Sequence, residues 1–114
     1  MTPRPRKWRF CAPLGGDTFF KPRGIPLSGL EIIELGQDEL EAMRLCDFEE
    51  MEQEEASKKM NISRGTVQRL LYSGRKKILN ALINTKALKV TGGEHIVPPP
   101  GFGRGRRHGR WGSF

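Results

Sequence analysis

Residues 53–77, QEEASKKMNISRGTVQRLLYSGRKK, constrain the fold of this 114-residue chain more than any other stretch. They predict two helices joined by a short turn, because their apolar residues fall where a helix-turn-helix buries its side chains. These residues are Ala56, Met60, Ile62, Val67 and Leu70. Asn61 falls at the turn, where positive φ is often needed and Asn tolerates it well. Ser63 follows at the position of an N-cap for the second helix.

The second helix is expected to run from about Arg64 into the low eighties and to have two different faces. One side is apolar or small: Val67, Leu71, Gly74, Ile78 and Ala81. The opposite side carries polar, basic and aromatic groups with a glycine: Gly65, Gln68, Arg69, Tyr72 and Lys76. Such groups can read base edges, and a glycine lets the backbone come close to them. An ordinary amphipathic helix with a solvated basic face is the alternative interpretation.

This pattern predicts two sets of DNA contacts. The base-reading residues would be Gly65, Gln68, Arg69 and Tyr72. The residues holding phosphates and the DNA backbone would be Ser63, Arg64, Thr66, Arg75, Lys76 and Lys77.

The distribution of charge along the chain agrees with this hypothesis of DNA binding. Residues 61–89 hold seven Lys and Arg and no acid, whereas residues 24–60 hold eleven acids and three bases. A basic footprint confined to certain elements is typical of a nucleic-acid binder. The acidic segment could instead orient the protein on DNA by repulsion, or bind a partner.

Both ends of the chain are basic and are predicted to lie outside the folded domain, which would span residues 11–97. Residues 1–10 form an arm in which two prolines bar a helix. Its cations are Arg4, Arg6, Lys7 and Arg9. They would lie along the DNA backbone or in a minor groove, and a disordered, soluble N-terminus is the alternative.

Residues 98–114 are rich in Gly and Arg and are predicted to be disordered. This tail could contact RNA or single strands, or it could only solubilise the protein.

The remaining segments predict a third helix and short strands. Residues 38–48 are expected to form a helix capped by Asp38, with Leu40, Met43 and Phe48 on its apolar stripe. It would pack across the helix-turn-helix to complete a trihelical domain. Short strands are expected near Phe19, at residues 31–35 and at residues 85–91. The last two could pair with each other.

Enzymatic motifs are absent from the sequence, so we expect neither catalysis nor a cofactor. Cys11 and Cys46 are too few to bind zinc alone, and the two histidines lie at no familiar ligand spacing from them, so no metal site is expected. The N-terminus lacks the apolar stretch of a signal peptide, and no apolar run reaches membrane-spanning length. We therefore expect a protein of the prokaryotic cytoplasm with reduced thiols.

The chain resembles the domain-of-unknown-function 134 family, small bacterial and archaeal proteins predicted to bind DNA. The matching stretches are PRPRKWR (residues 3–9), FKPRGIPL (20–27), DELEAMRL (38–45), QEEA (53–56), MNISRGTVQRLL (60–71) and ALKVTGG (87–93). The motif also looks like the promoter-reading region of sigma factors, which implies a mainly α, sigma region 4-like trihelical head with short flanking strands. Ser57 and Asn61 stand where that motif usually has Ala and Gly. The resemblance ends at Pro98, so the tail inherits nothing from it.

The leading hypothesis is a sequence-specific double-stranded DNA-binding protein, a transcriptional regulator that acts as a homodimer. An RNA- or single-strand-binding accessory protein that uses the Gly/Arg tail is one alternative. A sigma-like adaptor that docks on another protein through its acidic segment is the other.

Overall fold

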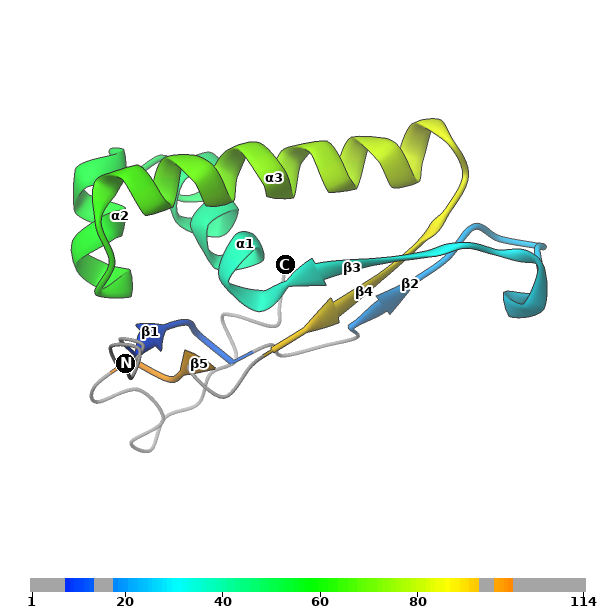
Figure 1. The fold of residues 1–114 in the computed structure, drawn as a ribbon, viewed down its shortest axis with the longest axis horizontal. Helices are drawn as coiled ribbons and strands as arrows, with labels where there is room; N and C mark the ends of the chain where they lie inside the picture. The colour runs from blue at the N-terminus through cyan, green and yellow to red at the C-terminus, as the bar shows by residue number, and fades with distance from the viewer. Residues whose placement is uncertain (1–7, 14–17, 93–95, 100–114) are drawn as a thin grey trace, which may run out of the picture.

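The computed structural model describes residues 8–13, 18–92 and 96–99. Within these ranges, three α-helices form one side of the molecule and two small sheets form the other (Figure 1). The longest helix, α3 (Arg64–Ile83), runs along the top. Its N-terminal half lies over α1 (Gln37–Met43) and beside α2 (Gln53–Met60), and its C-terminal half lies above the three-stranded sheet. A helical domain with short strands, as the sequence predicts, is therefore confirmed.

The turn between α2 and α3 has the geometry that its residues favour. Asn61 adopts φ 62° and ψ 43° and ends α2 by donating its backbone N–H to carbonyls of the last turn. Ser63 is the N-cap of α3, and its hydroxyl accepts the backbone N–H of Thr66 at 3.1 Å. Both local predictions are confirmed, as is the extent of α3 into the low eighties.

The helices pack around one core. Ala56, Met60, Val67 and Leu71 are at most 1% exposed, whereas Ile62 and Leu70 at its margin are half-buried. Gly74 lies where α3 packs against α1. A Cβ atom there would be 2.8 Å from Cε of Met43 and 3.2 Å from Cβ of Glu39. The small residue on the inner face of α3 therefore sets the distance between these two helices.

The predicted helix over residues 38–48 is present, but two details of its prediction are wrong. Its N-cap is Gly36, because the chain enters α1 directly from a strand, and Asp38 lies inside the first turn. Its second half, η2 (Arg44–Phe48), is a π-helix, in which hydrogen bonds span five residues. The wider turn changes the angular spacing of the side chains, so Phe48 leaves the apolar stripe and is 61% exposed.

The larger sheet has the strand order β2–β4–β3. Strand β3 (Ile32–Gly36) pairs in parallel with β4 (Ala87–Thr91), with Ile32 opposite Ala87. Strand β2 (Phe19–Phe20) pairs with β4 in the antiparallel sense, and a single 3-10 turn, η1 (Leu27–Gly29), lies between β2 and β3 in the chain. The predicted pairing of the strand near Ile32 with the strand after α3 is confirmed.

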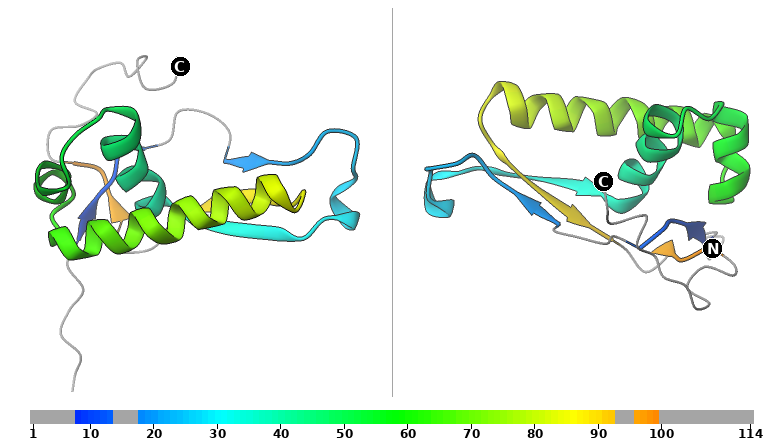
Figure 2. Two further views of the ribbon diagram at one scale, coloured as in Figure 1. Left: turned by 90° about the horizontal axis from the view of Figure 1, so that it is seen from above. Right: turned by 180° about the vertical axis from the view of Figure 1, so that it is seen from behind.

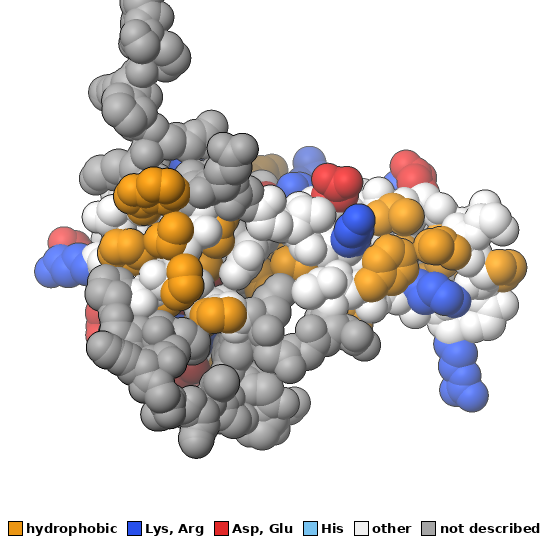
Figure 3. Space-filling view, turned by 90° about the horizontal axis from the view of Figure 1, so that it is seen from below, with side chains coloured by type: hydrophobic (Ala, Val, Ile, Leu, Met, Phe, Trp, Pro, Cys, Tyr) orange, Lys and Arg blue, Asp and Glu red, His pale blue; other side chains and the backbone are white. Residues whose placement is uncertain are grey.

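The second sheet was not predicted. It pairs β1 (Arg9–Phe10) in parallel with β5 (Ile96–Val97), beside α2 (Figures 1 and 2). Strands of two residues carry no periodic signal, so the sequence gives no sign of this pairing. Its consequence is that part of the predicted arm, residues 9–10, is folded. On the underside, apolar side chains gather over this pair and over the three-stranded sheet (Figure 3).

No helix in the described part of the chain is long and apolar enough to cross a membrane.

Candidate nucleic-acid interface

The outward face of α3 carries the predicted base-reading residues. Gly65, Gln68, Arg69 and Tyr72 are all exposed, and Tyr72 is 70% exposed. Lys76 continues the same face one turn further on and is also exposed. The opposite face is buried at Val67, Leu71, Gly74 and Ala81. Burial of one side of α3 therefore fixes which of its side chains are presented to solvent.

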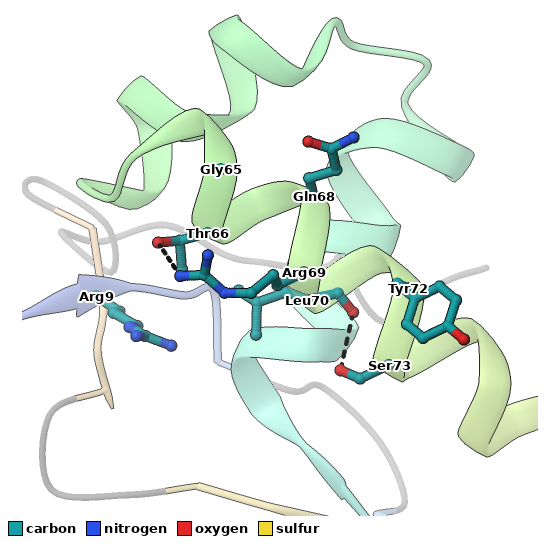
Figure 4. A pocket seen from close by; sticks show the side chains of 8 residues that line it. All are labelled: Arg9, Gly65, Thr66, Gln68, Arg69, Leu70, Tyr72 and Ser73. Atoms are coloured by element: carbon teal, nitrogen blue, oxygen red, sulfur yellow. Dashed lines mark hydrogen bonds between the residues drawn. The ribbon is translucent and has the colours of Figure 1, made fainter.

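The four predicted base-reading residues border a shallow hollow of about 730 Å³ between α3 and β1 (Figure 4). It is lined by Arg9, Gly65, Thr66, Gln68, Arg69, Leu70, Tyr72 and Ser73. Arg9 extends from β1 into the space beside Arg69, while Gln68 and Tyr72 point away from it. The hollow thus brings together a predicted arm residue and the predicted reading face, which lie more than fifty residues apart in the sequence.

A chain of hydroxyl contacts organises the first turns of α3. The hydroxyls of Ser63 and Thr66 are 2.8 Å apart, and Nη2 of Arg69 donates to Oγ1 of Thr66 at 3.3 Å (Figure 4). Arg69 is exposed, so this contact leaves the rest of its guanidinium open to solvent. The contact with Thr66 restricts the conformations of the flexible Arg69 side chain.

Two of the predicted phosphate-binding residues are held in ion pairs. Arg75 donates to both oxygens of Asp47, at 3.1 and 2.7 Å, and these hydrogen bonds raise the pKa of its guanidinium. Lys77 donates to Oε1 of Glu39 at 2.9 Å. Arg64 and Lys76 are exposed instead. The four cations of the predicted phosphate-binding set therefore divide into two that make no ion pair among the described contacts, Arg64 and Lys76, and two that neutralise acids of α1 and η2.

The carboxylate of Glu39 joins three elements beneath this face. It accepts hydrogen bonds from the Ser73 hydroxyl and from Lys77 on α3, and from the Gly36 N–H at the end of β3. Burial alone would raise the pKa of Glu39, but these hydrogen bonds outweigh it and hold the pKa below its usual value. Glu39 stays ionised and fixes α3 over α1 and β3.

Of the predicted arm residues, Arg9 is described by the structure. Arg9 donates to Oδ2 of Asp38 at 2.6 Å, so its position is set by α1 as well as by β5. Arg4, Arg6 and Lys7 lie outside the described residues, as do residues 100–114 of the tail. The sequence offered no sign that Arg9 would pair with Asp38 or that the Asn61 amide would donate to the Trp8 carbonyl at 3.0 Å. Both contacts join distant segments, and no local pattern encodes them.

The two cysteines differ in their surroundings. Cys11 is buried in the core, and burial, with Glu41 and Asp38 nearby, raises its pKa to about 12. Cys46 is half-buried, and partial burial also raises its pKa. In the described ranges, no three His, Cys, Asp or Glu side chains come together in a way that could hold a metal ion.

Comparison with known proteins relates the chain to one family. The family model described as "Protein of unknown function DUF134" matches residues 1–98. A UPF0251 protein of Caldanaerobacter subterraneus subsp. tengcongensis is 50% identical over 95 residues, which cover 83% of this chain and 80% of the relative. A UPF0251 protein of Pelotomaculum thermopropionicum is 53% identical over 91 residues, covering 80% and 69%. One from Thermoanaerobacter pseudethanolicus is 43% identical over 114 residues, covering 96% and 97%. No solved structure matches the chain.

Proposed function

We propose that this chain, which belongs to the DUF134 family of proteins of unknown function, binds double-stranded DNA sequence-specifically and regulates transcription. One observation carries the proposal. Gly65, Gln68, Arg69 and Tyr72 form an exposed strip on the first turns of α3, and Arg9 lies across the hollow beside them. The strip combines a guanidinium, an amide and a phenol with an open backbone position, which suits contact with base edges.

In this proposal, α2 and α3 form a helix-turn-helix of the sigma region 4-like kind. The N-terminal half of α3 enters the major groove, whose width of about 12 Å admits one helix. Arg64 and Lys76 bind phosphates on either side, because both are exposed and neither makes an ion pair among the described contacts. Arg75 would have to leave its ion pair with Asp47 to bind a phosphate, and Lys77 would have to leave its ion pair with Glu39. We therefore assign these two residues a smaller contribution to the binding free energy.

A selection from randomised duplex DNA, run at two salt concentrations, tests the proposal. Enrichment of a palindrome with half-sites about 34–36 Å apart would support a sequence-specific homodimer and define its operator. Recovery of unenriched DNA that washes away with salt would leave only electrostatic attraction and overturn the proposal. Retention of RNA in preference to duplex, lost when residues 98–114 are removed, would favour the tail-dependent alternative.

Substituting Arg69→Ala tests the placement of the reading face. We expect it to weaken binding to the selected duplex by about 1–3 kcal/mol and to relax the preference at one base pair. Arg23→Ala is the matched control, because Arg23 is also exposed but belongs to the loop after β2, remote from α3 in the chain. Electrophoretic mobility shifts at several salt concentrations measure both variants. Equal affinity of Arg69→Ala and the parent chain would show that the reading face has been misplaced.

Substituting Lys76→Ala separates phosphate binding from base reading. The loss of one phosphate contact should weaken binding to all duplexes alike and reduce the slope of log Kobs against log salt by about 1. Fluorescence anisotropy with the selected duplex and a scrambled one measures this slope. A loss confined to the selected duplex would assign Lys76 to base reading instead.

A further inference from the structure

The last turns of α3 expose an apolar surface on a helix whose inner side is packed. Leu79 is 54% exposed, and Leu82 and Ile83 are each 72% exposed, whereas Ala81 between them is buried. The three exposed side chains are spaced i, i+3 and i+4, so they are neighbours on one face of the helix. The C-terminal half of α3 has the three-stranded sheet on one side and no other described element on the opposite side (Figure 1). We call these three residues the apolar end of α3.

The apolar end of α3 lies in an uncharged stretch of a basic chain. Residues 78–85, ILNALINT, contain no acid and no base, although the whole chain has a net charge of +7. Arg75, one turn before Leu79, is paired with Asp47. A strongly charged partner would find no opposite charge here, whereas a second copy of the same surface matches it. Two copies of this chain can therefore meet here without opposing like charges at the contact.

The direction of this surface suits a symmetric pair that reads one duplex. Successive residues of an α-helix are about 100° apart, so Leu79 and Leu82 centre about 90° around α3 from the direction midway between Gly65 and Arg69. A twofold axis at right angles to a contact through the two leucines then points the same way as Gly65 and Arg69. Both copies of such a pair would present their reading residues to the same side.

The distance along α3 agrees with the same arrangement. The middle of the reading segment, residues 65–72, lies about 12 residues before the middle of residues 79–82, or about 18 Å at a rise of 1.5 Å per residue. Two antiparallel α3 helices that meet at Leu79 and Leu82 therefore place their reading segments about 36 Å apart. Half-sites one turn of DNA apart are separated by about 34–36 Å. The length of α3 beyond its reading segment thus matches one turn of the duplex.

We propose that two copies of this chain pack their α3 helices antiparallel through Leu79 and Leu82, with Ile83 at the margin, so that the two reading segments meet successive major grooves. The inference rests on the proposed DNA-binding function and names the surface through which the second copy binds. Three such side chains bury roughly 300 Å² per copy, whereas a stable complex buries about 600–1,000 Å² per partner. The dimer is therefore weak in solution and is completed when DNA holds both copies.

Substituting Leu79→Gln and Leu82→Gln together in the full-length chain tests the contact without changing its charge. Both side chains are exposed, so the fold should tolerate the change. We expect affinity for a duplex with one half-site to stay within about twofold of the parent, and affinity for the palindrome to fall about tenfold because the two copies no longer bind cooperatively. Leu27→Gln is the matched control, since Leu27 is 49% exposed on η1. Undiminished affinity of the double variant for the palindrome would overturn the inference.

Disulfide formation tests the antiparallel arrangement without DNA. In a Cys46→Ser background, one chain carries Leu79→Cys and a second chain, lengthened by a tag, carries Leu82→Cys. Antiparallel packing places these two positions opposite each other, so mild oxidation of the mixture should give the mixed dimer in preference to either symmetric one. A chain with Leu27→Cys is the control and should cross-link more slowly. Symmetric dimers in excess, or cross-linking no faster than in the control, would overturn the antiparallel contact.

The two experiments distinguish failure of the interface from failure of the proposed function. If the parent chain binds the palindrome but the glutamine variant binds it equally well and the mixed disulfide does not form, the interface alone is overturned. If the parent chain binds no duplex but the mixed disulfide forms, the antiparallel contact is retained, and its role on DNA is overturned together with the proposed function. Loss of palindrome binding in the glutamine variant, with preferred formation of the mixed disulfide, supports the inference in full.

Discussion

Two glycines of α3 differ in the space that a side chain would have at their positions. Gly74 is enclosed, and a side chain there would collide with Met43 and Glu39. Gly65 faces open space, since a Cβ atom there would meet only Oγ of Ser63, at 4.0 Å. The backbone of Gly65 does not need glycine either, because its φ is not positive. In the described chain, positive φ occurs at Gly24, Glu50, Asn61 and Thr85. Nothing in the fold therefore accounts for glycine at position 65, whereas a close approach to DNA would.

Substituting Gly65→Ala should separate folding from binding. Alanine has the higher helix propensity, so we expect the free energy of unfolding to stay the same or to rise by up to about 1 kcal/mol. In the proposed DNA complex, the added methyl group would stand between the α3 backbone and the bases, so affinity for the selected duplex should fall. Thermal unfolding and mobility shifts measure the two effects on one preparation. Unchanged affinity would remove Gly65 from the interface and leave its identity without an explanation.

Glu39 links secondary-structure elements rather than single residues, since it joins α1 to α3 and to the end of β3. Its pKa is lower in the folded chain than in the unfolded chain. Its ionised form therefore stabilises the fold above its unfolded pKa, near 4.5, and this stabilisation is lost as the pH falls through the lower folded value. Acid should loosen the contact between α1 and α3 through this group.

Substituting Glu39→Gln should lower the free energy of unfolding at pH 7 by about 1–3 kcal/mol, because Lys77 and Ser73 lose a charged acceptor. The difference from the parent chain should shrink below pH 4.5. Urea denaturation at several pH values measures this. Glu34→Gln is the control, since Glu34 lies exposed on β3. A difference that stayed constant with pH would show that shape, and not charge, gives Glu39 its effect.

The helices and strands also show which parts of the fold the sequence can predict. The ends of α2 and α3 follow from Asn61, Ser63 and the helical spacing of apolar residues, all of which are local signals. The exposed face of α3 follows for the same reason. The π-helical turn that exposes Phe48 and the pairing of β1 with β5 depend on contacts between distant segments. The hollow beside Arg9 could not be predicted either, because it exists only once β1 has docked.

At the scale of the whole molecule, the segment that follows the basic arm belongs to the core. Cys11 comes directly after β1, is 1% exposed and packs in the same buried cluster as Ala42, Leu45 and Met60. Its pKa is raised from 9.0 to about 12, so the folded chain holds a neutral thiol. Stability linked to this group is fully present below pH 9 and is lost as the pH rises toward 12.

The thiol of Cys11 should therefore react only when the whole domain opens. In a Cys46→Ser background, its alkylation at pH 8 should be slow and should rise with urea in parallel with unfolding followed by circular dichroism, because only the exposed thiolate reacts. The matched Cys11→Ser chain should label Cys46 faster in the absence of urea, since Cys46 is half-buried. Rapid labelling of Cys11 without urea would mean that β1 detaches on its own.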